Sequence, residues 1–127
     1  MEDGSRARRG DSGPPMTADI RIVRLWRAEA LPDRIPDYLE HFEAQVAPRL
    51  LGTRGFLGAR IVQRGVSAGV ELLVATFWES IEALRAFTGD DVSSAVVHPT
   101  ARAALLRVDD RAMNYEVVRT LTVPAPP

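Results

Sequence analysis

The feature that most constrains this chain is the order in which its hydrophobic periodicity changes. Four segments alternate apolar and polar residues as β-strands do, and two carry apolar residues every three or four positions as amphipathic helices do. In chain order they are strand 19–28, a helix within 31–51, strands 55–65 and 70–79, helix 81–88 and strand 111–121. We therefore expect an α+β domain of ferredoxin-like βαββαβ topology, a four-stranded antiparallel sheet with both helices on one face.

Local signals predict where both helices begin and end. Asp33 is a good N-cap for the first helix, and Pro48 with Gly52 is expected to close it. Ser80 is expected to cap the second helix and Gly89 to end it. The first helix has an apolar stripe that should face the sheet, made of Ile35, Tyr38, Leu39, Phe42 and Val46.

The chain has 127 residues, which is enough for one domain. We place the folded domain at 18–121, between a Gly-, Ser- and Pro-rich N-terminal tail at 1–17, expected to be disordered, and a C-terminal tail at 122–127. After the second helix, residues 90–97 predict one further helical turn that His98-Pro99 breaks.

Composition excludes several classes of function. The formal net charge of −1 gives no reason to expect a nucleic-acid or membrane partner. No apolar run approaches the roughly 20 residues that span a bilayer, so we expect a cytoplasmic protein. The absence of cysteine excludes disulfides and thiolate sites, and the two histidines are too few for a multi-histidine metal site.

Both sides of the third strand are apolar, with Leu72 and Val74 on one side and Leu73 and Phe77 on the other. Helices cover only one face of such a sheet, so the other would expose about eight apolar side chains, or ~12 kcal/mol of lost burial. A whole domain is stable by only ~5–15 kcal/mol. We therefore expect an obligate homodimer that packs sheet on sheet and buries about 2,000 Å².

Two segments, FWESIEALRAFTGDDV at 77–92 and NYEVV at 114–118, resemble the antibiotic biosynthesis monooxygenase family. The resemblance covers about 20–120 and implies the dimeric α+β barrel fold. Members of this family include cofactor-free oxygenases that oxidise polyketide phenols to quinones, and others that bind and degrade haem. The resemblance thus implies a cofactor-independent monooxygenase that acts on a small aromatic substrate between helices and sheet. The alternatives are a non-catalytic binding module for haem or another planar ligand, or a relative of the haem degraders.

The same resemblance suggests catalytic residues. Trp78 matches the active-site tryptophan of the phenol oxygenases, and His98 falls where the haem degraders place a histidine ligand. The residues themselves leave two interpretations of each. Trp78 is either a cavity wall or a large piece of core. His98 is either an acid–base group or ligand, or a loop histidine bonded to backbone or water. His41 is predicted on the exposed side of its helix.

Five further residues are candidates for substrate binding: Trp26, Phe42, Phe87, Arg24 and Tyr115. Phe42 and Phe87 either clamp a flat ligand or belong to the core. Arg24 alternates in phase with apolar residues, and a buried arginine needs a partner. That partner is a glutamate across the dimer or an anionic substrate. Tyr115 and its neighbour Asn114 point to opposite faces of the last strand, so at most one reaches the pocket.

Overall fold

A computed structural model of the chain describes residues 19–95 and 97–125. The first strand, β1 (Ile22–Ala30), is followed by a continuous helical run. A long hairpin of β2 (Phe56–Val66) and β3 (Gly69–Trp78) comes next, and then α3 (Ile81–Thr88). The last elements are α4 (Pro99–Ala103), β4 (Arg107–Val108) and β5 (Met113–Glu116). The expected N-terminal tail at 1–17 lies outside the described residues.

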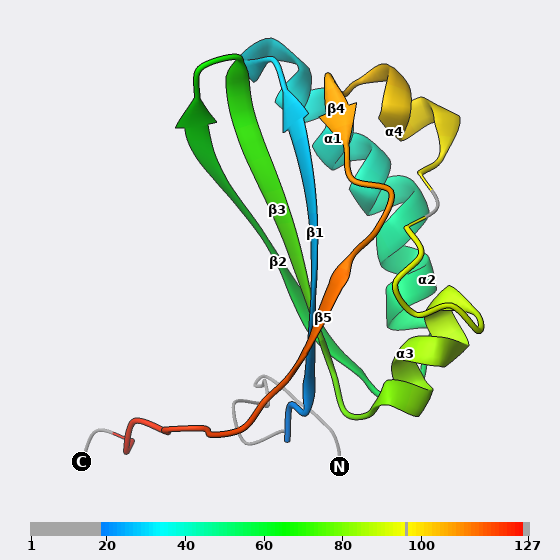
Figure 1. Cartoon of the computed structure of the whole chain (residues 1–127), viewed down its shortest axis with the longest axis vertical. Coiled ribbons are helices and arrows are strands. Elements are labelled where there is room, and N and C mark those ends of the chain that lie inside the picture. Colours follow the sequence, from blue (N-terminus) through cyan, green and yellow to red (C-terminus); the bar gives the residue numbers. More distant parts are fainter. Residues whose placement is uncertain (1–18, 96, 126–127) are drawn as a thin grey trace.

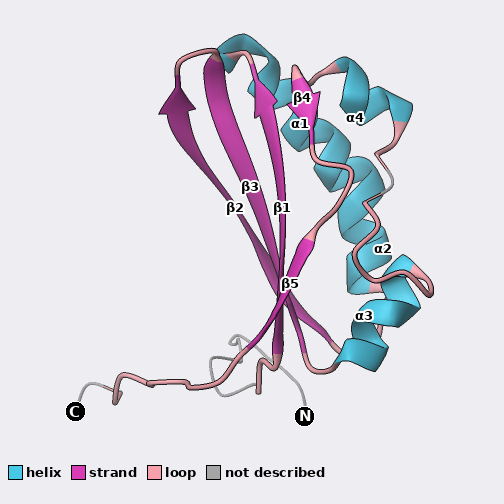
Figure 2. Ribbon diagram, in the orientation of Figure 1, coloured by secondary structure: helices cyan, strands magenta, loops and turns pink. Residues whose placement is uncertain are grey.

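The sheet is antiparallel, with strand order β2-β3-β1-β4, and β5 also pairs with β1. All helices lie on one side of it, as Figures 1 and 2 show. This confirms the predicted ferredoxin-like α+β architecture. No helix in the described part of the chain has the length and apolar character needed to cross a membrane.

The fourth strand differs from the single strand predicted at 111–121. β4 pairs with the end of β1 and β5 with its beginning, while residues 110–112 turn away to bond with 93–95. The Ala95 N–H donates to the Asp110 carbonyl, and the Ala112 N–H donates to the Ser93 carbonyl. The edge strand is therefore interrupted where residues 110–112 bond with the segment between α3 and α4.

The helical run after β1 ends before Gly52, as predicted, but is less regular than its local signals indicated. It comprises a 3₁₀ turn (Pro32–Arg34), α1 (Ile35–His41), a π-helical segment (Phe42–Val46) and α2 (Ala47–Leu51). The expected Asp33 cap is wrong, because α1 begins after Arg34 and has no side-chain cap. Pro48 does not end the helix either.

The π-helical segment explains how the helix passes Pro48. The Ala47 N–H donates to the Phe42 carbonyl, five residues back, which inserts one extra residue into the helix. Pro48 then falls in the first turn of α2, where its missing N–H costs little. The insertion also rotates the residues that follow it relative to those that precede it.

The second long helix follows its sequence signals. The Ser80 hydroxyl accepts a hydrogen bond from the Ala83 N–H at 3.1 Å, and Gly89 ends α3 with a φ of 91°. Leu84 on α3 is fully buried. The helical turn expected at 90–97 is wrong: Asp91–Ser94 form a hydrogen-bonded turn, and His98-Pro99 begins α4 instead of ending a helix.

The core lies between the sheet and the helices, and the opposite sheet face has no covering element in the described chain. Cross-strand registers place nine apolar residues on that face, half-buried or exposed. They are Val23, Leu25, Val62, Val66, Leu73, Ala75, Phe77, Met113 and Tyr115. We call this the open face. A register shift between Phe56 and Gly58 in β2 turns Phe56 and Ile61 toward the core.

Candidate functional site

A cavity of about 290 Å³ lies between the helices and the sheet. Its walls come from β1, β3, the helical run, α3, α4 and the segment between α3 and α4. The lining residues are Arg24, Trp26, Tyr38, His41, Phe42, Gln45, Val46, Arg49, Leu50, Val74, Thr76, Phe87, Thr88, Ser94, Ala95, Val97, His98 and Ala101. This volume is at the small end of ligand sites, which span roughly 300–1,000 Å³.

Arg24 is the buried cation of this cavity. It lies on the helix-covered side of β1 and is only 8% exposed. Its guanidinium donates to the Val92 carbonyl at 2.5 Å and to the Ser94 carbonyl at 2.9 Å. Among residues 19–95 and 97–125 it forms no ion pair with a carboxylate. Burial lowers the pKa of Arg24, because the charged form loses hydration there.

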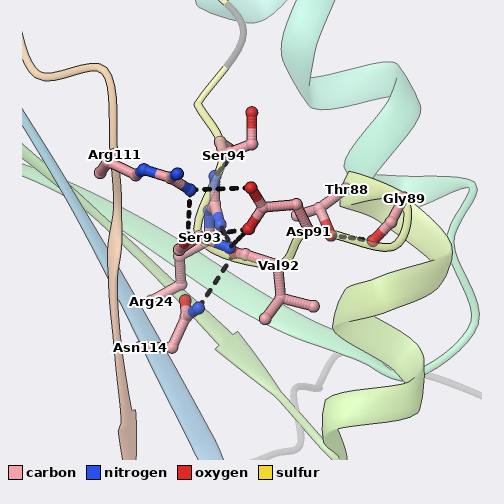
Figure 3. Close-up of polar contacts among 9 residues, drawn as sticks. All are labelled: Arg24, Thr88, Gly89, Asp91, Val92, Ser93, Ser94, Arg111 and Asn114. Atoms are coloured by element: carbon pink, nitrogen blue, oxygen red, sulfur yellow. Dashed lines mark hydrogen bonds and ion pairs between the residues drawn. The ribbon is translucent and has the colours of Figure 1, made fainter.

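The segment that closes the cavity after α3 is held by polar side chains, as Figure 3 shows. The Val92 carbonyl accepts from Arg24 and also from the Asn114 amide at 3.0 Å. Arg111 pairs with Asp91 at 2.8 Å and donates to the Ser93 hydroxyl. These contacts fix the segment against β1 and β5 and keep Arg24 directed toward it.

Two histidines meet at the α1–α4 end of the cavity. The ring centroids of His41 and His98 are 5.6 Å apart. The His98 Nδ1 accepts from the Thr100 N–H at 3.1 Å, which caps α4. His41 is 7% exposed, contrary to its predicted position on the wet side of its helix. Burial lowers the pKa of His41, and the nearby His98 lowers it further.

Aromatic rings form the other walls. Trp26 stacks on Tyr38 with centroids 6.2 Å apart, and its indole N–H donates to the Asp109 carbonyl at 2.7 Å. Burial raises the pKa of Tyr38 to about 12, so its hydroxyl stays protonated. At the α2–α3 side, the Arg49 guanidinium lies 4.6 Å from the Phe87 ring centroid.

The structure brings five of the predicted site residues together and leaves two apart. His98, Arg24, Trp26, Phe42 and Phe87 all line the cavity. The other two require correction.

Trp78 is fully buried and is not part of the lining. Its ring packs between Phe56 and Phe87, and its indole N–H donates to the Thr76 hydroxyl at 2.9 Å. Its burial favours the core interpretation of Trp78, which contacts the lining residues Thr76 and Phe87. Tyr115 lies on the open face, opposite Val23 of β1, away from the cavity.

Sequence reasoning missed several lining residues, chiefly His41, Gln45 and Arg49. One signal for His41 was available, because it lies three residues after Tyr38, which the periodicity placed on the inner stripe. Arg49 follows the π-helical insertion, and no local signal in the sequence revealed that shift.

The charge of the lining is one-sided. Four basic side chains line the cavity, namely Arg24, Arg49, His41 and His98, and no Asp or Glu of the described chain joins them. The described residues also hold no group of three or more acidic or histidine side chains placed to share a metal ion. The cavity is thus suited to an organic anion with a flat apolar body.

No protein-family model matches the sequence, and no curated protein matches it significantly. Solved structures do match. One is a Bacillus cereus protein assigned to the antibiotic biosynthesis monooxygenases, 17% identical over 83% of this chain and 100% of that chain, with a TM-score of 0.60. A second is the monooxygenase of ActVA-Orf6 from Streptomyces coelicolor in complex with nanaomycin D, 18% identical over 84% and 94%, with a TM-score of 0.52.

A third is a variant of the haem degrader MhuD from Mycobacterium tuberculosis with two manganese protoporphyrin IX molecules per active site. It is 24% identical over 80% of this chain and 99% of that chain, with a TM-score of 0.55. At these identities the likeness concerns the fold. The chain has the ferredoxin-like α+β fold of antibiotic biosynthesis monooxygenase-like proteins.

Proposed function

We propose that this chain is a cofactor-independent monooxygenase-like enzyme that binds an anionic aromatic substrate in the cavity between helices and sheet. The observation that carries the proposal is the combination of aromatic walls with four basic side chains and no described carboxylate. A phenolate fits both the aromatic walls and the basic lining. Its ring can pack on Trp26 and Phe87, while its oxygen accepts hydrogen bonds from the N–H groups of Arg24 that the backbone carbonyls leave free.

The chemistry follows from holding the substrate as its anion. An electron-rich phenolate transfers an electron to dioxygen far more readily than the neutral phenol does. In the oxidation of an anthrone-like CH₂ group to a carbonyl, one oxygen atom of O₂ enters the product and the other leaves as water. The substrate supplies all the electrons, so the protein contributes a dry pocket and oriented donors.

His98 has a more specific role in this scheme than the acid or base assigned from sequence. Because its Nδ1 accepts the Thr100 N–H, neutral His98 carries its proton on Nε2. It is therefore a hydrogen-bond donor to the bound substrate, and Nε2 has no lone pair with which to accept a proton.

Haem fits this donor set poorly. Ligation of iron needs a lone pair on a histidine nitrogen, but Nδ1 of His98 accepts the Thr100 N–H and Nε2 carries the proton in the neutral ring, so ligation would require a change of tautomer and loss of the α4 cap. The volume of about 290 Å³ also favours a compact fused-ring molecule over a macrocycle. The haem-binding alternative predicts a Soret shift on haemin titration that His98→Ala abolishes, whereas we expect no shift that depends on His98.

The test of the proposed function is oxygen uptake with an anthrone-like phenol, without added metal or flavin. We expect wild-type protein to consume one O₂ per substrate. Ala95→Trp fills the cavity from its lining and should abolish uptake. Ala68→Trp, in the exposed turn of the β2–β3 hairpin, is the matched control and should leave uptake unchanged. Uptake that is equal in all three proteins would refute a reaction in this cavity.

We also propose that two copies of the chain pack through the open face. Its nine apolar side chains are more than soluble monomers usually leave uncovered. Phe77→Asp, on that face between Val23 of β1 and Gly58 of β2, should convert a dimer to a monomer because it would bury an unpaired charge. Leu51→Asp, 78% exposed on the helical side, is the control. Light scattering that finds wild-type monomer at micromolar concentration would rule the dimer out.

A further inference from the structure

The two histidines are the part of the cavity that the proposed chemistry does not fully use. They come from distant parts of the chain and meet where α1 contacts α4, with their ring planes tilted by 39°. His41 also lies against Tyr38, with ring centroids 6.2 Å apart. Both imidazoles line the cavity, so both are available to a molecule inside it.

The tautomer of each ring follows from its hydrogen bonds. His98 accepts at Nδ1, so its neutral form presents an N–H at Nε2. The His41 Nδ1 is enclosed by protein and has no partner in the described structure. A proton there would be a buried donor without an acceptor, which is rarer and more costly than a buried lone pair. Neutral His41 therefore also carries its proton on Nε2.

The surroundings of His41 favour its neutral form. Protonating His41 would create the same unsatisfied donor at Nδ1 and would add a charge beside His98. The other titratable or charged groups of the lining are Tyr38 on α1, Arg24 on β1 and Arg49 on α2. None of these supplies a negative charge at neutral pH, because the Tyr38 pKa is about 12.

We propose that the Nε2–H groups of His41 and His98 form a two-donor subsite for a carboxylate carried by the aromatic substrate. The inference rests on the proposed function, since it assigns a second polar group to the ligand already placed in this cavity. When two N–H groups donate to one carboxylate, each nitrogen lies about 2.9 Å from an oxygen. The two donor nitrogens are then roughly 4–6 Å from each other. The ring separation of 5.6 Å is compatible with this arrangement.

A carboxylate suits this subsite for an electrostatic reason as well. It accepts from the buried His41 and the exposed His98 without requiring a formal cation on His41, and Arg24 remains free for the phenolate. Carboxylate binding should favour the protonated form of His41, so the pKa of His41 should rise when the carboxylate is present.

Two probes test the subsite: a hydroxynaphthoate with carboxylate and hydroxyl on opposite rings, and the naphthol that lacks only the carboxylate. We expect the hydroxynaphthoate to bind wild-type protein about tenfold or more tightly than the naphthol. His41→Leu removes one donor, and His98→Asn removes the other while keeping a good N-cap for α4. In both variants, most of the difference in affinity between hydroxynaphthoate and naphthol should disappear, while naphthol affinity changes little. His41→Gln, which restores an N–H near Nε2, should regain part of it.

Each outcome decides the proposal. Naphthol binding with no carboxylate advantage in wild type would overturn the subsite and leave the proposed function standing. An advantage that survives in both His41→Leu and His98→Asn would place the carboxylate elsewhere and overturn it too. Failure of both probes to bind would overturn the subsite together with the proposed function. Nitrogen-15 NMR at pH 7.5 offers an independent readout: a proton on Nδ1 of either ring contradicts the donor assignment.

Discussion

Replacing Arg24 by methionine is expected to weaken binding of a phenolate ligand by about 50-fold and to reduce oxygen uptake by at least as much. A hydrogen bond to a charged group contributes roughly 1.5–3 kcal/mol, and each 1.4 kcal/mol is about a factor of ten in affinity. Arg24 is the buried charge of the cavity and has no described carboxylate partner, so its spare donors are available to the ligand. The measurements are a dissociation constant from absorbance titration and the rate of O₂ consumption.

Arg24 also holds the segment over the cavity, so this structural role needs its own control. The Asn114 amide donates to the same Val92 carbonyl but carries no charge. Asn114→Ala should therefore loosen the segment while leaving the guanidinium in place. Equal losses of affinity in Asn114→Ala and Arg24→Met would mean that Arg24 acts only by positioning the segment. Arg24→Lys, which keeps the charge, should retain more affinity than Arg24→Met.

Replacing Trp78 by alanine is expected to lower the free energy of unfolding by about 3–5 kcal/mol, a large part of the ~5–15 kcal/mol available to a domain. The indole is fully buried between Phe56 and Phe87, so its loss leaves a cavity in the core. Urea denaturation followed by circular dichroism measures the change. Trp78→Phe should cost less, because it keeps an aromatic ring and loses mainly the hydrogen bond to Thr76.

Oxygen uptake of Trp78→Phe distinguishes a structural role of Trp78 from a catalytic one. Trp78→Phe should retain most oxygen uptake, since the indole does not line the cavity. Trp26→Phe is the comparison within the cavity: it removes the hydrogen bond to Asp109 and part of the wall, and should reduce ligand affinity more than stability. If Trp78→Phe had normal stability but no oxygen uptake, Trp78 would have a catalytic role.

The order of the elements was predictable because each signal is local. The Ser80 cap, the Gly89 helix end and the successive strands at 55–65 and 70–79 all depend on residues within a few positions of one another, and all three predictions are confirmed. The errors arise where a local signal competes with packing. Pro48 is a helix terminator by propensity, but the π-helical insertion before it lets the helix continue across the sheet.

The site was predictable only in part, for the same reason. Arg24 and Trp26 are two residues apart on β1, so the period of two places both side chains on the same face, toward the cavity. The periodicity could not decide between wall and core for Trp78, because the cavity-lining residues Val74 and Thr76 lie on the same face of β3 as the core. That choice depends on whether Phe56 and Phe87 close around the indole, which they do.

The sequence by itself determined the kind and order of the elements and the presence of apolar residues on both sides of β3. These properties follow from hydrophobic periodicity and helix capping, which depend on residues close together in the sequence. Only the tertiary structure decided that His41 and His98 meet and that the Arg24 guanidinium faces carbonyls and no carboxylate. Such contacts join residues far apart in the chain, and their geometry exists only once the helical layer has packed on the sheet.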